Sequence, residues 1–209
     1  LFVYVILYMP QLFTDSSGAL VILITGTLTI ALSLLVGIYL NIHAMPIVLG
    51  AMLAVNLLGP KPAYLVNFAV SLLGTFLTVR GAGMITSQML AVFLMTTIGG
   101  LTSIFMLRRN AQRIFVLVTG LVTGLVNFAV MLCIGALTSS DGMSVISDAA
   151  YALFGAITSG ILCVGLQPML EATFNLVTPA KLIELSNPNQ PLLRRLMIET
   201  PGTYHHSMI

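Results

Sequence analysis

The sequence has very little charge, and this scarcity limits what the protein can be. Charged residues make up 7% of its 209 residues, while hydrophobic residues make up 58% and the mean hydropathy is +1.06. A water-soluble domain of this size needs far more charge to cover its surface. The composition therefore excludes a soluble protein and indicates a polytopic membrane protein, with the lipid bilayer as its main partner.

Cysteine and targeting signals are also scarce. Cys133 and Cys163 both lie in apolar runs, where an oxidant or a metal would not readily reach them, and their spacing matches no metal signature. We interpret both as small hydrophobic core residues. The chain opens inside an apolar run, without an initiator Met, a basic segment or a small-residue cleavage site. We therefore expect an excerpt of a longer protein rather than a cleavable signal peptide.

Seven apolar segments follow one another along the chain, separated by short polar breaks. They cover residues 1–13, 18–40, 44–59, 63–79, 87–107, 114–137 and 149–174. Lipid offers the backbone no hydrogen-bond partners and no alternating barrel pattern is present, so we expect an all-α bundle of about seven transmembrane helices. The third and fourth are short, since about 17 residues rise about 26 Å against a hydrocarbon core of about 30 Å. They are either two short spans or one re-entrant hairpin within 44–79.

The basic residues predict the orientation of these helices. If the N-terminal end enters from outside, seven of the eight basic residues lie in the cytoplasm and only Arg80 lies outside. The seven are Lys61, Arg108, Arg109, Arg113, Lys181, Arg194 and Arg195. Cytoplasmic loops are rich in Lys and Arg, so we expect a turn at residues 60–62 inside, a loop with Asp141 and Asp148 outside, and a cytoplasmic C-terminus.

Polar residues inside the predicted spans are uncharged, and no span centre holds an acid, Lys or Arg. That pattern argues against a proton relay or an ion-coupled pump. We interpret the polar side chains as hydrogen-bonding to neighbouring helices; they are Asn56, Asn67, Gln88, Thr96, Thr97 and Asn127.

Small residues at close-packing spacing predict tight helix crossings. The pairs are Gly120 with Gly124 and Gly155 with Ser159. We assign Gly120, Gly124 and Asn127 to packing within the membrane. Packing inside one bundle and packing in a homodimer explain the pairs equally well.

The character of the sequence changes after Pro168, where charged residues return. We expect the last span to continue a turn or two beyond Pro168 as it leaves the bilayer. Thr178 and Pro179 then break it, because the residue before a proline avoids the helical region. A short amphipathic helix follows, with Pro191 in its first turn.

Two adjacent histidines, His205 and His206, stand near the end of this polar tail. They follow an expected turn at Pro201 and Gly202, and Thr203 is placed to cap a new helix. Neighbouring helical residues point about 100° apart, so only one histidine would face a given site. The pair alone is a weak signal for metal binding.

The tail resembles a junction found in the bacterial seven-transmembrane HD-domain family, the cyclic-di-AMP phosphodiesterases. The similarity lies in ELSNPNQPLLR at residues 184–194 and PGTYHHS at 201–207, with Thr200 where the family usually has Ala. The number of apolar segments, the GLVN run at 124–127 and the Arg-rich loop at 108–113 agree more loosely. The resemblance therefore covers the whole chain.

This resemblance implies a specific chemistry. An HD domain hydrolyses a phosphodiester with a pair of divalent metals, iron or manganese, that activates water, so the intact parent would convert cyclic-di-AMP to linear pApA. The family's first metal ligand is the His before Ser, which is His206 here, with His205 as the alternative or a supporting residue. The other ligands would follow Ile209, so we expect no catalytic residue in this chain and no hydrolysis by it alone.

The implied organisation has three parts. Residues 1–175 form the seven-helix domain, 176–200 a cytoplasmic linker with the amphipathic helix, and 201–209 the start of the HD domain. The parent would be a multi-pass protein of the bacterial inner membrane that binds cyclic-di-AMP through the missing domain and binds no nucleic acid polymer. Two alternatives stay open: a receptor with a degenerate HD domain, and a small transporter or channel, which requires a charged or ligand-lined cavity at mid-membrane.

Overall fold

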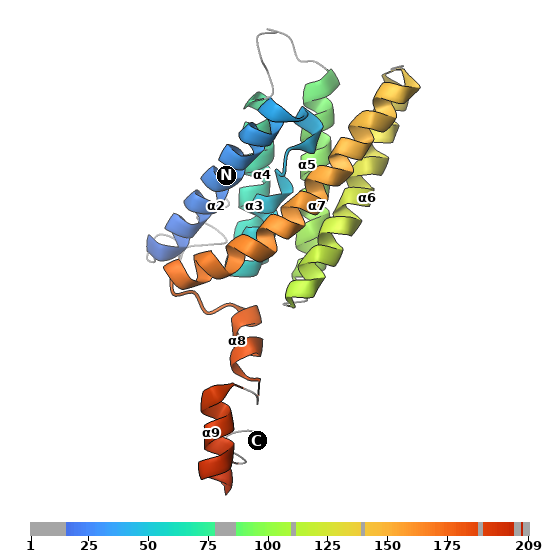
Figure 1. The fold of residues 1–209 in the computed structure, drawn as a ribbon. Coiled ribbons are helices and arrows are strands. Elements are labelled where there is room, and N and C mark those ends of the chain that lie inside the picture. Colours follow the sequence, from blue (N-terminus) through green and yellow to red (C-terminus); the bar gives the residue numbers. More distant parts are fainter. Residues whose placement is uncertain are drawn as a thin grey trace. The chain divides into compact units, whose positions relative to one another are not determined.

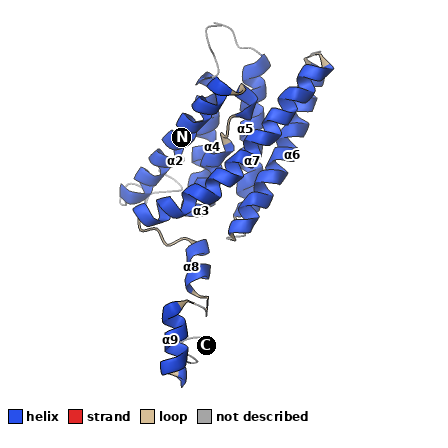
Figure 2. Cartoon of the chain, viewed as in Figure 1, coloured by secondary structure: helices blue, strands red, loops and turns tan. Residues whose placement is uncertain are grey.

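Helices form all the regular structure that the computed structural model describes, at residues 16–77, 87–109, 112–138, 141–187, 190–202 and 206 (Figure 2). In chain order they are α2 (Ser16–Tyr39), the short 3-10 helix η2 (Ile42–Ala44), α3 (Val48–Leu58), α4 (Pro60–Leu77), α5 (Ser87–Leu107), α6 (Arg113–Leu137), α7 (Gly142–Thr173), α8 (Pro179–Leu185) and α9 (Pro191–Glu199). The chain divides into two compact units, Leu1–Leu176 and Val177–Ile209. The first expected span, 1–13, lies outside the described residues.

Four helices of the described chain, α2, α5, α6 and α7, are long and apolar enough to cross a membrane. They pack side by side in the first unit together with α3 and α4 (Figure 1). The expected all-helical, multi-pass membrane fold is therefore confirmed. The count of seven spans stays a prediction, as does the choice between short spans and a re-entrant hairpin for 44–79.

Helix α3 lies at the centre of this unit. Nine of its eleven residues are buried, including Leu49, Met52 and Leu53, and it packs against α2, α4, α5 and α7. A helix of this length rises only about 16 Å. Because its neighbours cover it, α3 does not need the length that a lipid-exposed span requires.

The segment between α2 and α3 packs directly on α7. The side chain of Asn41 accepts a hydrogen bond from the backbone N–H of His43 at 2.9 Å and so caps η2. A Cβ atom added to Gly155 of α7 would lie 2.7 Å from the carbonyl oxygen of Ala44 and 3.1 Å from that of Met45. Only glycine leaves room for this backbone to approach α7 so closely.

Helices α6 and α7 cross at the predicted small residues. A Cβ at Gly120 would lie 3.3 Å from both the Ala156 carbonyl oxygen and the Gly160 Cα, and one at Gly124 would lie 3.0 Å from the Leu153 carbonyl oxygen. The face of α6 that carries Gly120 and Gly124 thus packs against α7 of the same chain, because small residues let two helix backbones approach closely.

Two asparagine side chains fill a notch on α5. Asn67 of α4 lies against Gly100 and donates to the carbonyl oxygen of Thr97 at 3.3 Å, while the buried Asn127 of α6 lies against Gly99. A side chain at either glycine would overlap the facing amide. The glycine pair therefore lets α5 pack between two polar neighbours.

The sequence-based roles of the other polar and sulfur-containing side chains are confirmed only in part. Asn56 reaches a neighbouring helix as expected, but Thr96 donates to Val92 of its own helix at 2.8 Å. Cys163 is fully buried, whereas Cys133 is exposed on the bundle surface. The expectation of two core cysteines was therefore wrong for Cys133, whose apolar helix presents that face outward.

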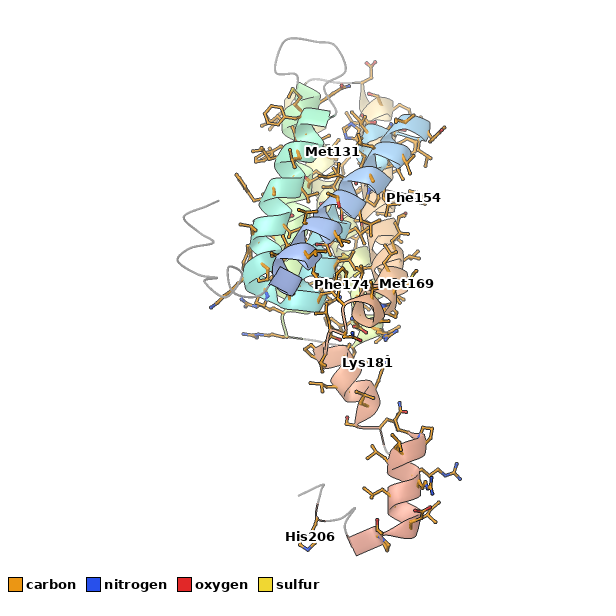
Figure 3. All side chains as sticks on the ribbon, turned by 90° about the vertical axis from the view of Figure 1, so that its left-hand side faces the viewer. Met131, Phe154, Met169, Phe174, Lys181 and His206 are labelled. Atoms are coloured by element: carbon orange, nitrogen blue, oxygen red, sulfur yellow. The ribbon has the colours of Figure 1, made fainter. Side chains whose placement is uncertain are left out.

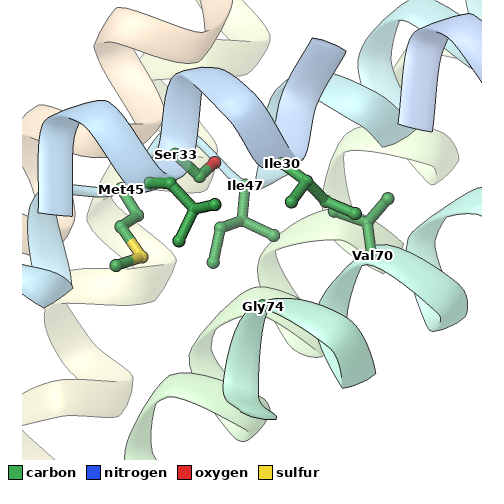
Figure 4. Close-up of a pocket in the computed structure, with 7 residues that line it drawn as sticks. Ile30, Ser33, Met45, Ile47, Val70 and Gly74 are labelled. Carbon is green, nitrogen blue, oxygen red and sulfur yellow. The ribbon is translucent and has the colours of Figure 1, made fainter. Parts of the chain in front are cut away.

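A small hollow lies where α2, α4 and the start of α3 meet (Figure 4). Its volume is about 10 Å³, and Ile30, Met45 and Val70 are among its lining residues. The buried hydroxyl of Ser33 at its wall has no hydrogen-bond partner among the described residues. A space of this size barely holds one water molecule, so it is a packing gap rather than a ligand site.

Two helices begin earlier than the sequence predicted. The expected turn at Pro60, Lys61 and Pro62 is wrong, because α4 starts at Pro60 and the reversal falls on Gly59, with φ of 94°. Proline suits a first helical turn because the N–H it lacks would have no partner there. Helix α7 likewise starts at Gly142, so Asp148 lies on a helix and not in a loop.

Candidate functional site

The polar tail folds as a unit of its own. The Thr178 hydroxyl accepts a hydrogen bond from the backbone N–H of Lys181 at 3.2 Å, and Pro179 opens α8. Helix α7 already ends at Thr173, so Thr178 and Pro179 begin the next helix and do not break α7 as expected. Helix α9 starts at Pro191, as the sequence predicted. Arg195 Nε donates to Glu199 Oε1 at 2.7 Å along its exposed surface.

The two histidines follow this helix. Pro201 and Gly202 are already helical, so the expected turn at these two residues is wrong; Thr203 and His205 lie outside the described residues. His206 is exposed (Figure 3). No group of three or more His, Cys, Asp or Glu side chains within metal-binding reach occurs in the described part of the chain. His206 offers one imidazole, so the residues present do not form a site for a metal pair.

A chain of polar contacts links α3, α7 and α6 where α7 ends. Asn56 Nδ2 donates to Gln167 Oε1 at 3.2 Å, and Gln167 Nε2 donates to Glu171 Oε1 at 2.8 Å. Glu171 Oε2 then lies 3.9 Å from Arg113 Nη2, and the Glu171 side chain is only 5% exposed. A buried carboxylate requires such partners, because burial without them is very costly.

The sequence reasoning missed this polar chain because it placed Glu171 where the last span enters water. The structure continues α7 past Pro168 to Thr173, as expected, but buries Glu171 against other helices. Gln167 and Glu171 are four residues apart, so they share one face of that helix. This spacing was the signal available in the sequence, but the position of Arg113 at the start of α6 needed the tertiary structure.

A second polar contact lies at the opposite end of α7. His43 Nε2 of η2 is 3.7 Å from Asp148 Oδ2, and the two side chains are 4% and 36% exposed. Burial lowers the pKa of His43 below its ordinary value of 6.5, although the charge of Asp148 acts in the opposite direction. The imidazole is therefore neutral at pH 7, and the pair is a polar contact rather than a full ion pair.

Helix α7 carries both contacts. It has 32 residues and is about 48 Å long, with Asp148 near its start and Glu171 near its end. Between them its outer face carries exposed apolar side chains such as Phe154 and Met169 (Figure 3). A movement of this helix would therefore change polar contacts at both ends of the bundle.

Comparison with known proteins relates this architecture to one family. The sequence profile of the family described as 7TM receptor with intracellular HD hydrolase matches residues 1–178. The chain belongs to this family. The resemblance inferred from the tail is thus confirmed by the membrane region.

Individual relatives agree with the family assignment. The chain is 34% identical over 168 residues to the cyclic-di-AMP phosphodiesterase PgpH of Listeria monocytogenes, covering 78% of this chain and 22% of that protein. It is 31% identical over 175 residues to PgpH of Bacillus subtilis, covering 82% and 24%. An uncharacterized Synechocystis protein, slr0104, is 48% identical over 62 residues, covering 30% and 8%.

The chain thus spans about a quarter of the length of the two PgpH relatives. No solved structure matches it.

Proposed function

We propose that this chain is the membrane-embedded, signal-transducing and anchoring portion of a metal-dependent cyclic-di-AMP phosphodiesterase. The match of residues 1–178 to a receptor family whose hydrolase is intracellular carries this proposal. The names of the two PgpH relatives supply the substrate. The PGTYHHS segment at 201–207 supplies the point where the hydrolase would begin.

The proposed organisation follows from that junction. Residues 1–175 form a seven-helix domain, 176–200 a cytoplasmic linker, and 201–209 the first residues of the HD domain. The distribution of Lys and Arg supports a bacterial inner-membrane protein with its N-terminal end outside and its C-terminus in the cytoplasm. In this orientation the His43 and Asp148 pair faces outside, and the Glu171 and Arg113 pair faces the cytoplasm.

Transduction through α7 fits the polar contacts at its two ends. The helix touches η2 near Asp148 and Gly155, and it touches α3 and α6 near Gln167 and Glu171. A signal that shifts α7 at one end would therefore act on the residues that lead into the linker. A homodimer would bring two such linkers together and is part of the proposal.

His206 is proposed as the first ligand of the metal pair in the intact parent, with His205 in a supporting position. The pair, iron or manganese, would supply an activated water for attack on phosphorus when bound. This chain contributes one imidazole to that site. It is therefore proposed to be inactive alone, with the remaining ligands on sequence that follows residue 209.

Cyclic-di-AMP hydrolysis tests this proposal directly. The 209-residue chain and the chain extended by its native downstream sequence are purified and assayed with added manganese. We expect pApA only from the extended protein, with His206→Ala lowering turnover at least about 100-fold and His205→Ala lowering it less. Turnover by the 209-residue chain above a metal-only control would contradict the assignment. Failure of the extended protein to hydrolyse cyclic-di-AMP would favour a degenerate HD domain.

A further inference from the structure

A cavity of about 270 Å³ lies beside the His43 and Asp148 pair. It is formed where α6 ends and α7 begins, and the start of α5 and the η2 turn complete its walls. Ligand pockets in proteins generally measure about 300 to 1,000 Å³. The size therefore suits a small molecule.

The charge of the lining selects a cation. Among the described residues that line the cavity, Asp148 is acidic and none is Lys or Arg. Asp148 is 36% exposed, so its carboxylate remains reachable from the cavity. His43 is 4% exposed, and its buried Nδ1 has no hydrogen-bond partner among the described residues. The imidazole is neutral at pH 7, so the described residues of the lining carry one net negative charge.

The hydroxyl groups of the lining reinforce this selection. Thr138 Oγ1 donates to the Ile134 carbonyl oxygen at 3.0 Å, and Ser144 Oγ donates to the Asp141 carbonyl oxygen at 2.7 Å. A hydroxyl group has one hydrogen and two lone pairs, so a hydroxyl oxygen can accept a hydrogen bond as well as donate one. With the carboxylate they form a set of acceptors. An ammonium group, which has only donors, is the complementary partner.

Apart from the Gln88 amide, the rest of the lining is apolar. It includes Ala91, Met131, Ile134 and Val145. A short hydrocarbon chain attached to the ammonium group would cover these side chains. A bare inorganic cation would leave them exposed to water.

We propose that the His43 and Asp148 cavity binds a small organic ammonium ion, with the ammonium group at Asp148 and a short hydrocarbon part against Met131 and Ile134. The occupant contacts both η2 and α7. The backbone of Ala44 and Met45, which directly follow His43, lies against Gly155 of α7. Binding at the cavity would therefore affect how this connection packs on α7. The proposal does not depend on the phosphodiesterase assignment, because it concerns binding by the 209-residue chain.

The probe is n-butylammonium chloride, added to the purified 209-residue chain in lipid nanodiscs while thermal unfolding is measured. We expect dissociation constants on the order of 1 mM for so small a ligand. At about 5 mM, five times this value, binding would stabilise the chain by about 1 kcal/mol and should raise Tm by about 2–4 °C. Neutral 1-butanol and potassium chloride at matched concentrations should produce no saturable rise.

Two acidic residues near the start of α7, Asp141 and Asp148, provide the matched variants. Asp148→Asn should abolish the rise in Tm, whereas Asp141→Asn should preserve it, because Asp141 is exposed and does not line the cavity. Thr138→Val, at an exposed position, should weaken the apparent affinity and tests the site if Asp148→Asn does not fold. Equal rises with 1-butanol, an unchanged response of Asp148→Asn, or no saturable binding up to roughly 50 mM would each overturn the proposal.

Discussion

Gly155 offers the sharpest test of how the helices of this bundle meet. In Gly155→Ala the new methyl group would lie 2.7 Å from the Ala44 carbonyl oxygen, whereas ordinary contacts begin near 3.4 Å. The η2 segment must therefore move by about 0.7 Å, and it also packs against α2. Such overpacking generally costs about 1–3 kcal/mol.

The helix itself acts in the opposite direction. Replacing glycine by alanine inside a helix stabilises it by about 1 kcal/mol, so the net loss at Gly155 should be about 1 kcal/mol. Gly165 on the same helix is the matched control, because a Cβ there meets nothing within 4 Å. We expect Gly165→Ala to be neutral or to stabilise by up to about 1 kcal/mol.

Thermal unfolding of the two variants in nanodiscs measures the difference. A gap of about 1–2 kcal/mol corresponds to about 2–8 °C in Tm for a domain of this size. Gly155→Ala should have the lower Tm. Equal Tm values for the two variants would show that the Ala44 and Met45 backbone does not approach α7 as described.

Three further predictions test other contacts. Gly100→Ala should lower Tm because its methyl group overlaps the Asn67 amide, and adding Asn67→Ala should recover most of the loss; no recovery would contradict the described notch. Glu171→Gln should lower the stability measured by thermal unfolding by about 1–3 kcal/mol, because Arg113 would lose the negative charge that it faces. The exposed Glu199→Gln is the control and should cost less than about 0.5 kcal/mol. Similar losses in the two variants would refute the stabilising role of Glu171. The pKa of His43 is lower in the folded chain than its ordinary value of 6.5, so the unfolded chain binds a proton first as the pH falls. The contribution of His43 to the free energy of unfolding is therefore fully present above pH 6.5 and is lost below it. The decline of Tm with acidity should therefore be smaller in His43→Gln, and superimposable pH profiles would rule out this contribution.

The sequence predicted the parts of the fold that depend on local chemistry. Hydropathy indicated helices in lipid, and the bounds of α5 and the proline at the start of α9 agree with the structure. The continuation of the last span past Pro168 was also anticipated. Errors appeared at helix starts such as Pro60, where a residue typical of turns also suits a first helical turn.

Contacts between distant segments were not predictable in the same way. The sequence marked Gly155 as a packing residue and paired it with Ser159, but the structure places the end of the short 3-10 helix η2 against it, not another long helix. Glu171 looked solvent-exposed because its partners come from α3 and α6. The hydropathy pattern of a single helix does not predict which other helices lie beside it.

One candidate site could be predicted from the sequence and the other could not. The tail motif around His206 identified the family from sequence alone, and the described structure adds no further ligand there. The cavity beside Asp148 could not be predicted from the sequence, because Asp148 was expected in a loop and lies on α7 instead.

The amino-acid sequence by itself determined the solvent, the helical class and the family of this protein, because transfer into lipid and a contiguous motif depend on residues close together in the chain. The tertiary structure alone decided the buried position of α3, which segments the glycines of α5, α6 and α7 face, and the polar pairs at both ends of α7. These depend on which faces of separate helices meet, and that choice is made by the packing of the whole bundle.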